Sequence, residues 1–280
     1  MNNSNLTIGL YDSGIGGLSL LKKLVKQTRN INYLYLGDNL NAPYGNKSKT
    51  ELISLTENGV KTLYGYGANI IILACNTLST TLLLDLKNSE SLKNLNVNLY
   101  GVFPPKIDSY DTALICTQLT AKSNYVKNYF SKTKIIPLPF LASEIERFVF
   151  SKEKINFKAD VSAVNENVKT LILGCTHYSI FKNEFIKLLP KVNVVDGLSI
   201  TVNEVKKAID IANKTLNVKR VVTTNHKTLT ATKPIVINGN KVFFVGETSF
   251  YNKKVFKFIL KWLPKCPWWS FFYKKIKKSY

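Results

Sequence analysis

The chain has 280 residues, of which 45% are hydrophobic, and its 39 lysines and arginines against 18 acidic residues give a net charge of +21. This length and apolar content suit one large domain or two modest domains with real cores, and they exclude a disordered chain. The four scattered cysteines and two histidines exclude a disulfide framework and closely spaced zinc ligands, and no uncharged apolar run reaches the roughly 18 residues that span a bilayer.

The first motif is a glycine-rich turn that follows a strand predicted over residues 6–11. Residues 12–17 read DSGIGG and lead into a helix from Ser19, so the backbone N–H groups of the turn could bind an anion. The turn matches a dinucleotide fingerprint only in part, because Ser19 replaces the third glycine and Asp12 would repel a pyrophosphate. Asp12 is better interpreted as a catalytic or orienting carboxylate, with a helix N-cap as the structural alternative.

A second strand, residues 33–36, precedes Gly37-Asp38 and a loop in which proline and glycine mark turns. Tyr44 and the backbone amide of Gly45 could contact a ligand, although the stretch taken alone favours a simple loop. A helix over about residues 48–66 then leads to the next strand.

Two cysteines follow similar apolar strands. Residues 70–77 read IIILACNT and residues 170–177 read TLILGCTH, and each run precedes a predicted helix. A single free cysteine is most often a small buried hydrophobe, but the repeat indicates an internal duplication that presents Cys75 and Cys175 to one cleft. A helix N-terminus lowers a thiol pKa, so a thiolate is expected near neutral pH.

The second half of the chain repeats the order of strand, polar turn and helix. Residues 99–105 predict a strand ended by prolines, which marks a domain boundary. The strand at 112–115 leads to a turn that is the counterpart of the Asp12 turn, where Thr117 and Thr120 could bind a carboxylate or cap the helix. The remaining predicted elements are a strand, turn and helix at 135–150 bearing Glu144 and Glu146, a strand and turn at 192–197, and a helix at about 201–216.

The pattern changes after about residue 218. Short strands are predicted at 221–224, 235–237 and 242–245, and a basic tail carries Trp262, Trp268 and Trp269. The tail could lie on an anionic membrane, but docking onto the body of the protein is favoured because its apolar residues lack a clean helical period.

The positive charge is carried almost entirely by lysine, since only Arg29, Arg147 and Arg220 are arginine. Readers of bases and phosphates rely on the arginine fork, so no specific nucleic-acid partner is expected. The lysines are interpreted as a solvated surface that reflects coding bias, and their field could attract an acidic small substrate.

Together these stretches resemble the glutamate racemase family of cofactor-independent amino-acid racemases. The matching stretches are 9–18, Gly37-Asp38 with Pro43-Tyr44-Gly45, 74–77, 117–123 and 173–178, spanning about residues 6–200. The resemblance implies an α/β fold of two pseudo-symmetric, doubly wound parallel-sheet domains with the active site between them. The first domain would comprise residues 1–98 and about 200–255, the second 99–199, with a basic aromatic tail at 256–280.

The resemblance also implies roles for individual residues. Cys75 would deprotonate the D-enantiomer with help from Asp12, and Cys175 the L-enantiomer with help from His177, with Glu144 as a further carboxylate. The positions that match or complete a substrate site are Asp12, Ser13, Tyr44, Gly45, Asn76, Thr77, Thr117, Thr120, Thr176 and His177.

The implied protein is a cytoplasmic isomerase that needs no cofactor or metal, binds glutamate as its small-molecule substrate, and supplies D-glutamate for peptidoglycan, cell-wall biogenesis and cell shape. A reducing compartment fits the free thiols, and the N-terminus shows no secretory signal. A homodimer and weak contact of the tail with an anionic membrane are compatible with the sequence. Two alternatives remain: a racemase for aspartate or another amino acid, and a non-enzymatic protein on this fold that associates with nucleic acid or membranes.

Overall fold

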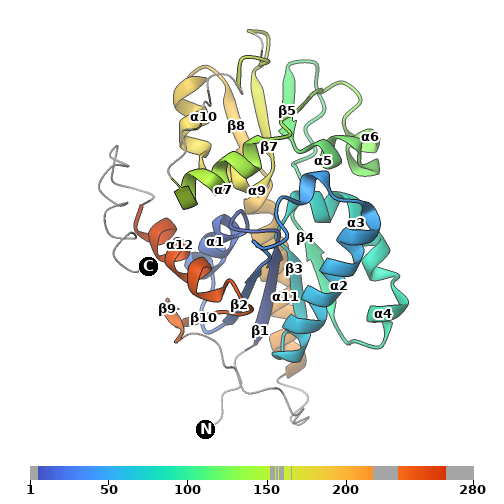
Figure 1. Ribbon diagram of the computed structural model, residues 1–280, viewed down its shortest axis with the longest axis vertical. Coiled ribbons are helices and arrows are strands. Elements are labelled where there is room, and N and C mark those ends of the chain that lie inside the picture. The colour runs from blue at the N-terminus through green and yellow to red at the C-terminus, as the bar shows by residue number, and fades with distance from the viewer. Residues whose placement is uncertain are drawn as a thin grey trace.

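The computed structural model describes residues 6–151, 155, 157, 161–164, 166–216 and 233–262. These residues form two sheets, and in Figure 1 the second sheet lies above the first, with helices α7 and α9 between them. The first sheet has the order β4-β3-β1-β2-β10-β9 and the second has the order β6-β5-β7-β8. The strands are β1 (Thr7–Asp12), β2 (Asn32–Gly37), β3 (Ile70–Leu73), β4 (Asn98–Gly101), β5 (Thr112–Cys116), β6 (Lys134–Pro137), β7 (Thr170–Gly174), β8 (Asn193–Asp196), β9 (Ile235–Ile237) and β10 (Asn240–Phe244).

The two sheets share one topology. Counted along the chain, the strands β1 to β4 are arranged in the order second, first, third, fourth, and β5 to β8 are arranged in the same order. All of these neighbours are parallel. The expected class of two pseudo-symmetric, doubly wound α/β units is therefore confirmed.

Helices cover the faces of both sheets (Figure 1). They are α1 (Leu18–Gln27), the short 3₁₀ helix η1 (Tyr44–Asn46), α2 (Lys49–Gly65), α3 (Asn76–Lys87), α4 (Glu90–Lys93), α5 (Gln118–Lys122), α6 (Asn124–Tyr129), α7 (Leu141–Ser151), α9 (Thr176–Ile180), α10 (Lys182–Leu188), α11 (Leu198–Leu216) and α12 (Ser249–Trp262). None of the described helices is both long and apolar enough to cross a membrane.

The local sequence explains these elements. In β3, Ile70 and Ile72 face one apolar core while Ile71 and Leu73 face another, as expected of a parallel strand covered on both sides. Helix α2 begins at a capping box, in which Ser48 Oγ accepts from the Glu51 N–H at 3.2 Å and the Glu51 carboxylate accepts from the Ser48 N–H at 3.0 Å. The core next to Ile72 continues into the second sheet, so the two units pack against each other.

The C-terminal part of the chain completes the first sheet. Strand β10 pairs in parallel with β2, and β9 pairs with β10 in antiparallel fashion. The buried side chain of Asn240 secures this edge, since Oδ1 accepts from the Ile31 N–H at 2.9 Å and Nδ2 donates to the carbonyls of Val25 and Thr28 at 3.0 and 2.9 Å.

Several boundaries differ from the sequence-based expectation. Strand β4 is the edge of the first sheet, so that sheet extends to Gly101 rather than ending at residue 98. Residue 256, the expected start of the tail, lies within α12. Val255 and Phe256 are buried because they pack on the apolar core that contains Ile72. The strand expected at 221–224 and the residues Trp268 and Trp269 lie outside the described residues, and the division into domains remains a prediction.

Candidate active site

The two cysteines occupy equivalent places in the two sheets. Cys75 follows β3 and Cys175 follows β7, and each is the N-cap residue of the next helix, α3 or α9. Both strands lie beside the first strand of their unit, at the point where the strand order reverses. Ligands of open α/β sheets bind outside the carboxyl ends of strands at such a point.

Cys75 is buried, with 5% of its surface exposed, and its Sγ accepts a hydrogen bond from Ser13 Oγ at 3.6 Å. Burial and the charge of Asp12 raise the pKa of the Cys75 thiol to about 11, and hydrogen bonds from Leu78 N–H and Ser13 offset this only in part. The expected lowering of the pKa at a helix N-terminus is therefore wrong for Cys75, because desolvation outweighs the helix end.

Asp12 is fully buried at the end of β1. Its Oδ2 accepts from the Gly14 N–H at 3.0 Å and from the Tyr35 O–H at 3.3 Å. Burial raises the pKa of the Asp12 carboxyl, although the charge of His177 acts in the opposite direction. The N-cap of α1 is Gly17, so Asp12 does not cap this helix, and its role as a catalytic or orienting carboxylate stays a prediction.

Cys175 begins a chain of polar contacts that ends on the first unit. His177 Nδ1 lies 3.9 Å from Cys175 Sγ, and His177 Nε2 lies 2.7 Å from Glu146 Oε1. The same Glu146 oxygen accepts from the Ile15 N–H at 2.9 Å, and Asn39 Nδ2 donates to Oε2 at 3.3 Å. Burial alone would lower the pKa of His177, but its hydrogen bonds to Cys175 and Glu146 and the Glu146 charge raise it well above the ordinary value.

The carboxylate in this chain is Glu146 rather than the expected Glu144. Residues two positions apart on α7 point about 200° apart around the helix axis, so only one of them can reach His177. Glu144 lies in the first turn of α7 and is partly exposed, whereas Glu146 is buried.

The backbone N–H groups of the glycine-rich turn bind carboxylates of the protein itself. The Ile15 N–H is used by Glu146, and the Gly14 N–H is used by Asp12. A Cβ added at Gly14 would lie 2.0 Å from Glu146 Oε1, so glycine is needed for this close approach. With these donors occupied, the turn offers them to no pyrophosphate.

The threonines expected to bind substrate meet across the two units. Thr77 Oγ1 lies 2.9 Å from Thr117 Oγ1, which donates to Thr120 Oγ1 at 3.0 Å and accepts from the Thr120 N–H at 3.3 Å. Thr117 is therefore both a helix cap and a member of a hydroxyl cluster, and a Cβ added at Gly45 would be 3.5 Å from Thr117 Cβ. Thr176 Oγ1 is buried and has no hydrogen-bond partner among the described residues.

Two expected residues use their polar groups elsewhere. The Tyr44 hydroxyl donates to the Asp38 carboxylate and lies 2.7 Å from the Tyr11 hydroxyl. The Asn76 amide donates to the Val102 carbonyl at 3.1 Å, on the segment that joins the two sheets. In the structure both side chains support the walls of the site.

Sequence reasoning missed Tyr35 and Asn39. Tyr35 is completely buried beside Asp12, and Asn39 contacts Glu146. A tyrosine inside an apolar strand needs a hydrogen-bond partner, which is the signal that could have drawn attention to Tyr35. Nothing in the sequence near Asn39 indicates its contact with a helix more than 100 residues away.

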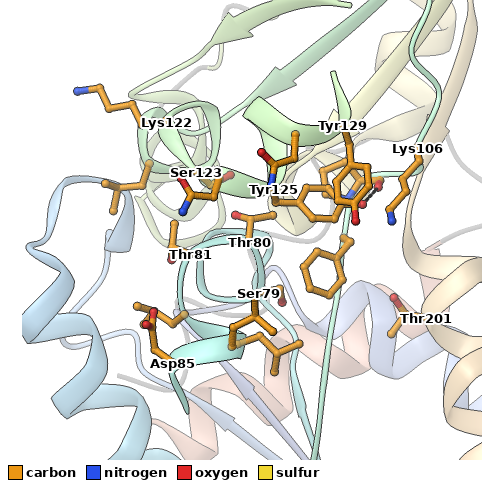
Figure 2. A pocket seen from close by; sticks show the side chains of 18 of the residues that line it. Ser79, Thr80, Thr81, Asp85, Lys106, Lys122, Ser123, Tyr125, Tyr129 and Thr201 are labelled. Carbon is orange, nitrogen blue, oxygen red and sulfur yellow. Dashed lines mark hydrogen bonds between the residues drawn. The ribbon is translucent and has the colours of Figure 1, made fainter. Parts of the chain in front are cut away.

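One cavity lies outside this cluster. It has a volume of about 880 Å³ and is lined by α3, by the segment from Phe103 to Lys106, and by parts of α5, α6 and α11. Figure 2 shows Ser79, Thr80 and Thr81 of α3 at this cavity, with Tyr125, Tyr129 and Lys106 on the opposite side. Neither thiol lines it. Cys175, like Cys75, is only 5% exposed, so both thiols are buried in this structure.

Comparison with known proteins gives a consistent result. No family model matches the chain. The glutamate racemase of Fusobacterium nucleatum subsp. nucleatum is 33% identical over 279 residues, which covers 91% of this chain and 94% of that protein. The glutamate racemase of Clostridium novyi is 30% identical over 235 residues, which covers 78% of this chain and 89% of that protein.

The solved structure of glutamate racemase from Aquifex pyrophilus superposes with a TM-score of 0.61 at 26% identity, covering 91% of this chain and 95% of that one. The relatives are thus matched over most of their own length, and the arrangement of the sheets is shared as well. The chain belongs to the glutamate racemase family.

Proposed function

We propose that the protein interconverts L- and D-glutamate by moving protons at Cα between Cys75 and Cys175, without a cofactor. The observation that carries this proposal is the equivalence of the two thiols at the ends of β3 and β7, in sheets of identical strand order. Racemisation needs a base on one face of Cα and an acid on the other, and the roles exchange with direction. Duplication of one thiol site supplies both groups.

The surroundings of the two thiols suggest which part each takes at the start of the proton transfer. With its pKa raised to about 11, Cys75 holds its proton at neutral pH and is ready to act as the acid. A protonated His177, 3.9 Å from Cys175 Sγ, places a positive charge beside the other sulfur. The Cys175 thiolate would take the Cα proton of L-glutamate while Cys75 delivers its proton to the opposite face, and the reverse transfers would convert D-glutamate.

The carbanion has to be stabilised without an electron sink. We assign this task to the hydroxyls of Thr77, Thr117, Thr120 and Thr176 and to the backbone N–H groups at the starts of α3 and α9. These donors surround a buried site, where hydrogen bonds to developing charge are stronger than in water. The side chains of Asp12 and His177 would return protons to equilibrium between turnovers.

As in the family, the product D-glutamate would serve peptidoglycan synthesis, and we place the reaction in the reducing cytoplasm because the mechanism requires free thiols. The cysteines at positions 75, 116 and 175 are free in the structure. A homodimer and a contact of the C-terminal tail with anionic membrane remain predictions.

The test is solvent deuterium incorporation followed by NMR, with no cofactor added, on both enantiomers of glutamate and of aspartate. Exchange at Cα of glutamate with inversion is expected. Exchange confined to aspartate would change the substrate, and no exchange with any of the four compounds would refute the racemase.

The two-thiol mechanism is tested with Cys75→Ala and Cys175→Ala. Neither variant should invert glutamate, and residual exchange should be confined to the L enantiomer in Cys75→Ala and to the D enantiomer in Cys175→Ala. Cys116→Ala is the matched control, because Cys116 is buried in a separate core beside Leu114 and should keep full turnover. Inversion at the normal rate in either site variant would refute the mechanism.

A further inference from the structure

The proposed reaction leaves the buried hydroxyl of Tyr35 at the site without a role. Tyr35 on β2 is completely buried, and its hydroxyl lies 2.7 Å from the Gly14 carbonyl and 3.3 Å from Asp12 Oδ2. Its ring is held in place, since it packs against Phe244 at 5.9 Å between centroids and its Cε1 lies within 3.0 Å of a Cβ built at Gly37. The ring is fixed, so only the hydroxyl hydrogen is free to rotate.

A phenol has one hydrogen to donate and lone pairs that can accept, so it cannot donate fully to both oxygens at once. When Asp12 is ionised, the hydrogen can point to Oδ2. When Asp12 is protonated, the hydrogen can point to the Gly14 carbonyl while the phenol oxygen accepts from the carboxyl O–H. Both acceptors lie within reach of the fixed oxygen, so the exchange needs only a rotation.

We propose that Tyr35 is a positioning residue whose hydroxyl rotates between Gly14 and Asp12, keeping Asp12 hydrogen-bonded in both of its protonation states. The inference rests on the proposed function, in which Asp12 returns protons to equilibrium between turnovers and therefore gains and loses a proton. Burial and the charges of Asp12 and Glu146 raise the pKa of Tyr35 well above its ordinary value, so the phenol keeps its own proton throughout.

The titratable groups that act on Asp12 come from four elements. They are His177 on α9, Glu146 on α7, Cys75 at the start of α3, and Tyr35 on β2. Tyr35 can be changed without altering the net charge of this set, because Tyr35→Phe removes only a hydroxyl. A change in the pH dependence of turnover can then be assigned to the loss of the hydrogen bond between the Tyr35 hydroxyl and Asp12.

The same strand provides the matched control. Tyr33 lies two residues before Tyr35 and is also completely buried, and burial also raises its pKa above the ordinary value. Its hydroxyl lies 2.9 Å from Thr28 Oγ1, far along the strand from Asp12. Tyr33→Phe thus removes a buried hydroxyl from the same sheet without touching the site.

The experiment compares kcat/KM for both enantiomers of glutamate over a pH series in the wild type, Tyr35→Phe and Tyr33→Phe. Tyr35→Phe should lower kcat/KM by about 10- to 100-fold, the range for losing a hydrogen bond to a charged group. It should also move the acidic limb of the profile to higher pH, because the hydrogen bond to the ionised carboxylate is stronger than the one to the protonated carboxyl, so the ionised form loses more. Tyr33→Phe should leave the limb in place, with kcat/KM within about threefold of the wild type.

Equal profiles for Tyr35→Phe and Tyr33→Phe, in a wild type that racemises glutamate, would overturn the role of Tyr35 and leave the proposed function standing. A wild type that does not racemise would overturn both. If Tyr35→Phe does not fold, 3-fluorotyrosine at position 35 keeps the volume and the hydroxyl but donates more strongly. The acidic limb should then move to lower pH, and an unmoved limb would refute the inference.

Discussion

The two units approach each other closely at Gly16, where the neighbours include backbone, and this contact gives the sharpest prediction. A Cβ added there would lie 2.5 Å from Thr176 Oγ1, 2.6 Å from His177 Nδ1 and 2.9 Å from the His177 backbone nitrogen. Ordinary contact begins near 3.4 Å, so Gly16→Ala has to move the start of α9 by about 0.5 to 0.9 Å. Overpacking of this kind destabilises a protein by about 1–3 kcal/mol.

The effect on activity should exceed the effect on stability. His177 holds its place between Cys175 and Glu146, so a shift of this size stretches contacts of 3.9 and 2.7 Å. A misplacement of about 1 Å can lower turnover by roughly 100-fold. We therefore expect Gly16→Ala to remain folded in urea titrations while its kcat for glutamate, measured by circular dichroism, falls by about two orders of magnitude.

Gly65→Ala is the matched control. Gly65 is the last residue of α2, no heavy atom lies within 4 Å of its added Cβ, and its φ is not positive. Alanine there should be neutral or stabilising by up to about 1 kcal/mol, with normal turnover. Turnover of Gly16→Ala within threefold of Gly65→Ala would refute the reasoning that α9 rests directly on the turn.

Two further predictions concern charge. Glu146→Gln should lower the pKa of His177 and reduce turnover, whereas Glu144→Gln should change neither. Because the chain has only two histidines, the pKa of His177 can be followed by NMR. Equal effects of the two variants would contradict the assignment of Glu146. Asp12→Asn should abolish racemisation. Its free energy of unfolding should increase relative to that of the wild type as pH rises. The folded-state pKa of Asp12 is raised above its usual value of 3.8, so the stability supplied by its proton is fully present below about pH 4 and is lost as pH rises through the raised pKa. Urea unfolding from pH 4 to pH 7 measures the difference in free energy of unfolding between Asp12→Asn and the wild type. A difference that does not change with pH would contradict the prediction.

The sequence was sufficient for the parts of the fold that rest on local patterns. Apolar runs ending in a cysteine predicted β3 and β7, and the apolar stretch at 99–105 predicted β4, although that strand ends at Gly101, three residues before Pro104. The repeat of these runs also predicted that the two halves share a topology. Periodicity and repetition depend on residues near one another in the chain, which is why they could be interpreted without coordinates.

The details of the site depend on contacts that no local pattern encodes. Glu144 and Glu146 are equally acidic and lie on one helix, and only the docking of α7 against α9 decides which of them meets His177. The raised pKa of Cys75 has a related cause. The helix end is visible in the sequence, but the depth of burial and the neighbouring charge of Asp12 are set by the packing of both units.

The position of β10 has a consequence for how the protein is made. The second sheet is built from one continuous stretch, residues 112–196, and can be completed as soon as that stretch has left the ribosome. The first sheet starts at Thr7 but is finished only by β10, whose Asn240 joins the loop before β2. Until about 240 residues have been synthesised, the β2 edge lacks its β10 partner, so the sheet that begins first is completed last and its edge is open to wrong pairing in the meantime.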